Sequence, residues 1–81
     1  MNEAEIYKKM QQVFDEVFLT KVVITPSLSA KEVEEWDSVT HISLIMEVER
    51  AFQVRFRVGE VEATQNLGEF VQLIGRRLND Q

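Results

Sequence analysis

Apolar side chains recur at three- and four-residue steps in three stretches of the chain, a spacing typical of amphipathic helices. The pattern predicts helices over about 3–18, 38–52 and 67–79. Each stretch follows a residue whose side chain can accept hydrogen bonds from the unpaired N–H groups of a first helical turn. These cap residues are Asn2, Asp37 and Asn66.

The first connecting segment, residues 19–37, breaks the helical period with a short apolar run that ends at a proline. A single strand in so short a chain would leave its backbone groups unpaired, so the segment is predicted to be a long loop. Its residues Val23, Ile24 and Leu28 are predicted to plug the open end of a helix bundle. Trp36 is interpreted as a core or staple residue next to the second helix.

The second connecting segment, residues 53–66, alternates apolar and polar positions like a strand but has no segment to pair with. It is predicted to be an extended connector with one short helical turn at 60–63. The fold prediction is all-α: a small four-helix bundle with a long first loop, in which three longer helices and one short helix form a single domain over residues 1–81.

The composition limits the chemistry that the chain can carry out alone. It contains no cysteine, which excludes a disulfide framework and a cysteine-based zinc site. One histidine and scattered carboxylates match no zinc or calcium motif, so no metal is predicted. No apolar run is long enough to span a bilayer and no signal peptide is evident. We therefore expect a cytoplasmic monomer that does not enter the membrane.

The net charge of −5 is confined to one part of the chain. Between Lys31 and Glu49, six acids accompany a single base, whereas acids and bases balance elsewhere. The six are Glu32, Glu34, Glu35, Asp37, Glu47 and Glu49. This distribution argues against nucleic acid as a partner and favours proteins with basic docking surfaces. An ordinary solvated surface on an acidic domain is the alternative.

The second predicted helix combines a strong cap, a hydroxyl and an apolar face. Asp37 caps the helix, and Ser38 falls on its first turn, where partial positive charge favours a phosphate on or beside the hydroxyl. The predicted apolar face consists of Val39, Ile42, Ile45, Met46, Val48 and Phe52. Ser38 as a plain helix-start residue is the alternative.

An enzyme would need Ser38 as nucleophile and His41 as base. The chain has no G-x-S-x-G elbow and too little length to enclose a substrate pocket. We therefore predict no catalytic residue and no enzymatic activity.

The chain resembles the acyl carrier proteins over about residues 3–78. The resemblance lies in the helix order, the long first loop, the local acidity and the Asp37-Ser38 pair at the start of the second long helix. The resemblance implies that Ser38 carries 4′-phosphopantetheine, which a phosphopantetheinyl transferase moves from coenzyme A onto the hydroxyl. The thiol of this arm would hold acyl groups as thioesters. Ser38 would then be an anchor, and the arm would supply the thiol that the chain lacks.

The resemblance also implies that acyl-loading and acyl-using enzymes dock on the helix that follows the serine. The candidate docking residues are Asp37, Val39, Met46 and Glu49. For Met46, core packing is an equal alternative.

Several positions depart from the pattern of fatty-acid-synthesis carriers. Acidic residues are usual there two, five and twelve positions after the serine, where this chain has Thr40, Ser43 and Arg50. Val39 also replaces the common leucine. These departures favour a dedicated carrier in a specialised fatty acid, polyketide or lipid pathway. A peptidyl or D-alanyl carrier, and an acidic helical interaction module without a prosthetic group, are the alternatives.

Overall fold

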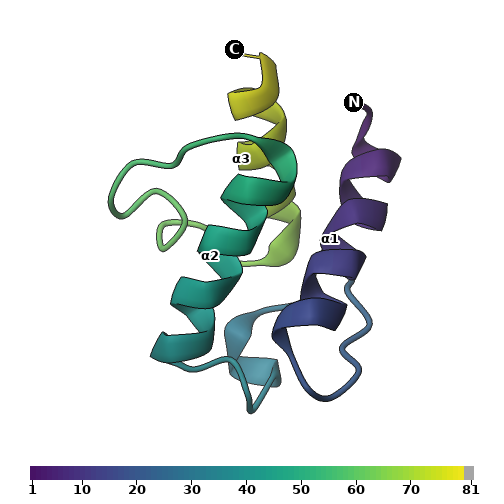
Figure 1. Cartoon of the computed structure of the whole chain (residues 1–81), viewed down its shortest axis with the longest axis vertical. Coiled ribbons are helices and arrows are strands. Elements are labelled where there is room, and N and C mark those ends of the chain that lie inside the picture. Colours follow the sequence, from purple (N-terminus) through teal and green to yellow (C-terminus); the bar gives the residue numbers. More distant parts are fainter. Residues whose placement is uncertain (80–81) are drawn as a thin grey trace.

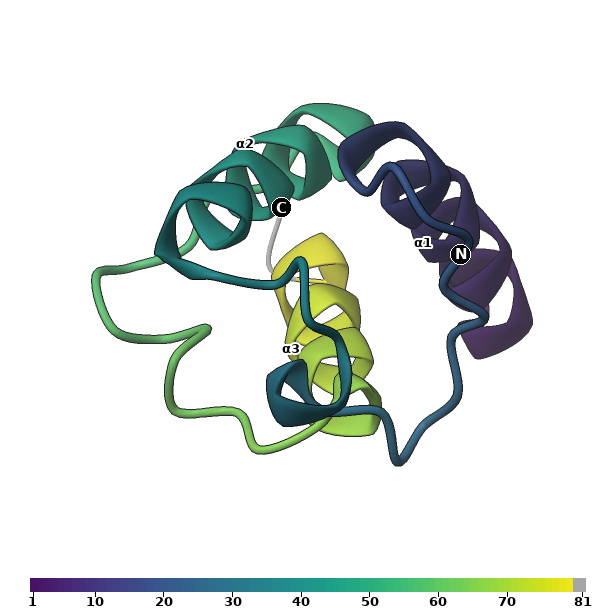
Figure 2. The same ribbon diagram turned by 90° about the horizontal axis from the view of Figure 1, so that it is seen from below.

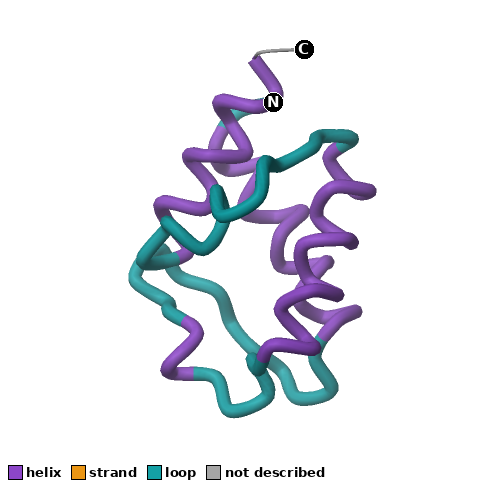
Figure 3. The backbone as a smooth tube through the Cα atoms, turned by 90° about the vertical axis from the view of Figure 1, so that its left-hand side faces the viewer, coloured by secondary structure: helices purple, strands orange, loops and turns teal. Residues whose placement is uncertain are grey.

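The computed structural model describes residues 1–79, which form three α-helices and one short 3₁₀ helix. The helices are α1 (Glu3–Val17), η1 (Ala30–Glu32, 3₁₀), α2 (Ser38–Phe52) and α3 (Leu67–Asn79). No strand occurs within the described residues, and Figure 3 draws both connecting segments as loops apart from the short turn of η1 in the first. The predicted all-α class and the three long helices are confirmed. None of the helices in residues 1–79 has the length and apolar character needed to cross a membrane.

The three long helices surround a common apolar core. In Figure 1, α1 and α2 run in opposite directions, and α1 packs against both α2 and α3. Figure 2, seen from below, shows the first loop crossing the end of α3 where that helix begins. The largest fully buried side chains are Met10, Phe14, Leu44, Val48, Leu67, Val71, Leu73 and Ile74.

The predicted caps of α1 and α3 are present. Asn2 Oδ1 accepts the Glu5 N–H at 2.8 Å, while the Glu5 carboxylate accepts the Asn2 N–H at 2.9 Å. This is a complete capping box. At α3, Asn66 Oδ1 accepts the Glu69 N–H at 2.9 Å, but the Glu69 carboxylate accepts from Gln65, one residue before the cap. Local hydrogen bonds thus fix both helix starts.

The face that α2 buries differs from the prediction of one broad apolar face. Leu44, Val48 and Phe52 enter the core, whereas Val39 and Met46 are 72% and 64% exposed. Ile42, predicted to be buried, is 60% exposed. At about 100° per residue, the three exposed side chains point away from the core, opposite the buried set. α2 therefore carries two apolar stripes, and we call Val39, Ile42 and Met46 the outer stripe.

The first loop is anchored to the start of α3. Leu28 O accepts the Leu67 N–H at 2.8 Å, and Leu28 is buried. Ile24 packs against the core, as does Val22, while Val23 is 68% exposed. The prediction was wrong for Val23, because alternate side chains of this extended run point to opposite sides.

The short helical segment of the fold lies in the first loop as η1. A short helical turn was predicted at residues 60–63, but this segment forms hydrogen-bonded turns instead. The Ala63 N–H donates to Gly59 O at 3.1 Å, and the Thr64 N–H donates to Val61 O at 3.0 Å. Gly59 has a φ of +84°, a left-handed conformation that favours glycine and interrupts regular helix. These turns still place Val61 in the core.

Candidate functional site

Asp37 and Thr40 together cap the N-terminus of α2. Asp37 Oδ1 accepts the N–H groups of Val39 and Thr40, each at 3.0 Å. In return, Thr40 Oγ1 accepts the Asp37 N–H at 2.8 Å. The hydrogen bond from the Thr40 N–H is the main reason why the pKa of Asp37 is lowered. The predicted cap is confirmed, and Thr40, which departs from the acidic carrier pattern, is its second half.

Ser38 is the first residue of α2 and lies exposed at the surface. Its hydroxyl makes no hydrogen bond within residues 1–79. Because Asp37 already occupies the N–H groups of Val39 and Thr40, a phosphate on Ser38 would not have these donors as partners. The neighbouring carboxylate would also repel it. These residues therefore fit a covalent attachment that projects into solvent, with an accessible hydroxyl and no pocket for the phosphate.

The predicted docking residues fall into two groups. Val39 and Met46 lie together on the outer stripe, which begins directly after Ser38. Asp37 is engaged in the helix cap, and Glu49 is half-buried with its carboxylate accepting the Phe56 N–H at 2.8 Å. The exposure of Met46 rules out its alternative role in the core. Sequence periodicity had assigned Ile42 to the core, and only the packing of α2 reveals it as part of this surface.

Most of the six clustered acids hold the loops and helix ends together. The Glu32 carboxylate accepts the Ser29 N–H at 2.8 Å at η1. The Glu35 carboxylate accepts the N–H groups of Leu19 and Thr20 at 3.0 and 2.8 Å, and also the Thr20 hydroxyl. That hydroxyl is the main cause that lowers the pKa of Glu35. The acidity near Ser38 therefore has a structural role.

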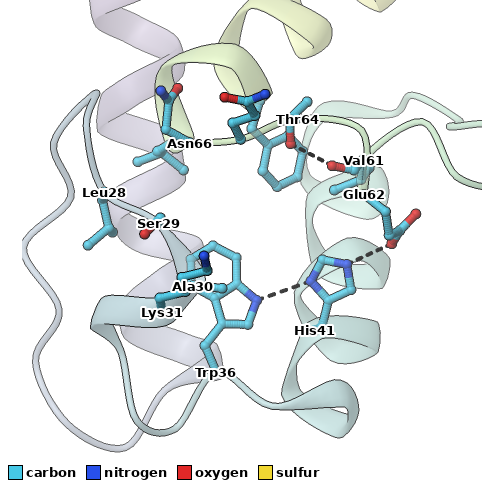
Figure 4. Close-up of a pocket in the computed structure, with 13 residues that line it drawn as sticks. Leu28, Ser29, Ala30, Lys31, Trp36, His41, Val61, Glu62, Thr64 and Asn66 are labelled. Carbon is cyan, nitrogen blue, oxygen red and sulfur yellow. Dashed lines mark hydrogen bonds and ion pairs between the residues drawn. The ribbon is translucent and has the colours of Figure 1, made fainter.

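Trp36, His41 and Glu62 form a hydrogen-bonded chain between three segments (Figure 4). Trp36 Nε1 lies 3.1 Å from His41 Nδ1, and His41 Nε2 lies 2.7 Å from the Glu62 carboxylate. An indole N–H can only donate, so His41 Nδ1 accepts and Nε2–H donates to Glu62. This bond is the main cause that lowers the pKa of Glu62. Both ring nitrogens of His41 thus bind residues other than Ser38.

A cleft of about 530 Å³ opens beside this chain of residues (Figure 4). Small-molecule sites commonly measure about 300–1,000 Å³. The apolar part of its wall is formed by Leu28, Trp36, Val61, Leu67 and Phe70. The polar part is formed by Ser29, Lys31, His41, Glu62, Thr64, Gln65 and Asn66. The sequence did not predict this cleft, because its residues come from four separate parts of the chain.

The fold and the site define a class of small all-α protein that presents an exposed serine at the capped start of its second long helix. The chain is similar to the holo acyl carrier protein from Geobacter metallireducens, whose structure was solved by solution NMR. The TM-score is 0.75 at 28% sequence identity, over 96% of this chain and 86% of that one. No protein-family model and no curated protein matches the chain. The resemblance to the acyl carrier proteins is confirmed, and the chain has the fold of that family.

Proposed function

We propose that the chain is an acyl carrier protein whose Ser38 bears a 4′-phosphopantetheine arm. The observation that carries the proposal is the exposed Ser38 hydroxyl, without a hydrogen-bond partner in the described residues, at the first position of α2 in a fold shared with a holo acyl carrier protein. The arm supplies a thiol that binds acyl groups as thioesters. This suits a chain that contains no cysteine.

The chain's own contribution to arm attachment is to present a nucleophile. The Ser38 hydroxyl attacks the phosphorus of coenzyme A next to the pantetheine, so that one P–O bond forms as the bond to the adenosine bisphosphate breaks. The hydroxyl proton passes to a base of the phosphopantetheinyl transferase. Asp37 does not serve as this base, because its carboxylate caps α2 and its lowered pKa makes it a weak proton acceptor. Ser38 is therefore an anchor that depends on its partner for catalysis.

Partner enzymes would dock beside Ser38 on α2. The outer stripe supplies the apolar part of this surface, and Met46 is adaptable enough to serve several partners. Asp37 and Glu49 would add negative charge at its edges for enzymes with basic surfaces, although both carboxylates are hydrogen-bonded internally. Thr40 and Arg50 stand where housekeeping carriers have acids, which favours a specialised fatty acid, polyketide or lipid pathway. We propose that the carrier acts as a monomer in the cytoplasm.

The deciding experiment is intact mass spectrometry of the protein after incubation with coenzyme A and a broad-specificity phosphopantetheinyl transferase. We expect a gain equal to one phosphopantetheine. Ser38→Ala should abolish the gain, and Ser43→Ala, which changes another exposed serine of α2, should retain it. Absence of the gain, or its persistence in Ser38→Ala, would contradict the proposal and favour an interaction module without a prosthetic group.

A further inference from the structure

Two arginines in the segment after α2 carry positive charge that no group within residues 1–79 neutralises. Arg55 and Arg57 are exposed, and their side chains make no hydrogen bond or ion pair with the described residues. The chain has a net charge of −5, yet no acid occurs between Arg50 and Glu60. This short segment therefore has the opposite sign to the chain as a whole and attracts carboxylates instead of basic surfaces.

The core fixes the beginning of this segment. Val54 is buried, and the Phe56 ring packs against Phe70 with 5.8 Å between the ring centroids. The Phe56 N–H donates to the Glu49 carboxylate at 2.8 Å. Inward-facing and exposed side chains alternate here, so Arg55 is held in place by an anchored neighbour on each side.

A turn fixes the end of the segment. The Glu60 carboxylate accepts the Arg57 N–H at 2.8 Å and forms an ion pair with Arg77. The Glu60 N–H in turn donates to Arg57 O at 3.1 Å. Val58 lies within this turn, and its side chain is fully exposed. The turn therefore holds an apolar side chain in solvent directly after Arg57.

The main chain at Arg55 offers an open edge for a second strand. Its N–H and C=O groups make no hydrogen bond within residues 1–79. In an antiparallel pair, a single residue of the partner strand can bond to both groups. Because burial alternates as in an extended segment, Arg55 and Arg57 lie on the same side, about 7 Å apart from Cα to Cα. Carboxylates two residues apart on a partner strand have the same spacing.

The start of the segment lies far from Ser38. Ser38 begins α2 and the segment follows its end, so the two are separated by the length of a 15-residue helix, about 20 Å. Figure 1 shows the chain leaving α2 at the end of the molecule opposite the start of that helix. A partner bound there would leave the Ser38 hydroxyl accessible.

We infer that Arg55, Arg57 and Val58 form a docking surface, the arginine edge, for an extended acidic segment of a partner protein. The partner adds a short antiparallel strand at Arg55, its carboxylates pair with the two arginines, and an aliphatic side chain contacts Val58. The inference goes beyond the proposed function, because it requires neither Ser38 nor an arm. It gives the chain a second docking surface, opposite in charge to the region around Ser38.

The test is an NMR titration of the isotope-labelled chain with the acetylated and amidated peptide TETEVE at millimolar concentration. We expect the largest amide shifts at residues 54–58, a downfield shift of the Arg55 N–H as it gains a hydrogen bond, and no shift at Ser38. The lysine peptide TKTKVK should cause none of these shifts. A peptide with N-methylated glutamates keeps the charges but lacks main-chain donors there, so it should bind more weakly.

Arginine variants test the residues themselves. Arg55→Gln combined with Arg57→Gln should weaken the binding of TETEVE about fivefold, since it removes two exposed ion pairs. Lys8→Gln combined with Lys31→Gln is the matched control, because it removes the same charge from other exposed positions, and it should retain the affinity.

Four results would overturn the inference: binding of the lysine peptide, equal affinity for the N-methylated peptide, equal affinity of the arginine variant, or shifts centred on the start of α2. Binding to phosphatidylglycerol vesicles but not to TETEVE would overturn it in favour of a lipid surface. Ser38→Ala should bind TETEVE as the wild type does, so a failure of arm attachment leaves the inference intact.

Discussion

Thr40 and Asp37 exchange hydrogen bonds across the first turn of α2. The Thr40 hydroxyl accepts the Asp37 N–H at 2.8 Å, and Asp37 Oδ1 accepts the Thr40 N–H at 3.0 Å. The same hydroxyl donates to Glu35 O at 2.6 Å, so it also fixes the chain that enters the helix. The position of Ser38, which lies between the two residues, therefore depends on Thr40.

Thr40→Val should destabilise the protein by about 1 kcal/mol, because the valine keeps the shape of the side chain but loses the hydroxyl bonds to the Asp37 N–H and to Glu35 O, which then keep only their mutual hydrogen bond at 2.9 Å. Unfolding in urea measures the change. Thr40→Ser keeps the hydroxyl and is the matched control, for which we expect a smaller loss. Equal stability of Thr40→Val and wild type would show that water replaces these bonds without cost.

Stability should fall in acid because of Glu35 and Asp37. Hydrogen bonds lower the pKa of both carboxyls. The main one comes from the Thr20 hydroxyl for Glu35 and from the Thr40 N–H for Asp37. A lowered folded-state pKa stabilises the protein above the ordinary carboxyl pKa of about 4, and this stabilisation is lost as the pH falls through the lowered values.

Thermal melting between pH 7 and pH 2 tests this prediction. We expect the melting temperature of the wild type to fall once the pH is lowered below about 4. Glu35→Gln keeps one acceptor oxygen for Thr20, loses the bond from the Leu19 N–H and cannot titrate, so its melting temperature should be lower at pH 7 but should depend less steeply on pH. A curve as steep as that of the wild type would assign the acid sensitivity to other groups.

Sequence pattern predicted the features that depend on neighbouring residues. The caps at Asn2 and Asp37 form hydrogen bonds two or three residues away, so the information lies within a few positions. The helix bounds follow from these caps and from the apolar period. The orientation of α2 was harder to predict, because apolar residues cover two of its sides and only packing against α1 and the common core decides which side is buried.

The cleft and the roles of the acids could not be read from local pattern. The Glu62 carboxylate reaches His41 across 21 positions, and Glu35 reaches Leu19 across 16. Nothing in the spacing of these residues indicates that they meet. The sequence showed an excess of acids near Ser38 and suggested a docking surface, whereas most of these carboxylates bind groups that only the folded chain brings close.

The two apolar stripes of α2 should respond differently to truncation. Leu44→Ala removes a side chain that is fully buried and should cost about 2–5 kcal/mol of unfolding free energy. Ile42→Ala removes a side chain that is 60% exposed and should change stability by less than about 0.5 kcal/mol. Urea unfolding of both variants measures these values. A large loss for Ile42→Ala would mean that this face is covered in solution.

The outer stripe should be required for recognition by partner enzymes. The phosphopantetheinyl transferase is the partner whose kinetics test this. If the stripe is buried in the complex, Met46→Ser should lower kcat/KM for arm attachment about tenfold, since burying one such side chain contributes about 1.5–3 kcal/mol. The loss should appear without a change in stability, because Met46 lies outside the core. Steady-state kinetics of the transferase, together with urea unfolding, measures both.

Salt separates apolar docking from docking driven by charge. Exposed ion pairs are screened over about 8 Å at physiological ionic strength, so an encounter with a basic enzyme surface should weaken as salt is added. Glu34→Gln is the matched control, because Glu34 is exposed and makes no bond within the described residues. We expect kcat/KM to change more with Met46→Ser than with Glu34→Gln. The reverse order, with a steep fall in added salt, would assign recognition to the acids instead of the stripe.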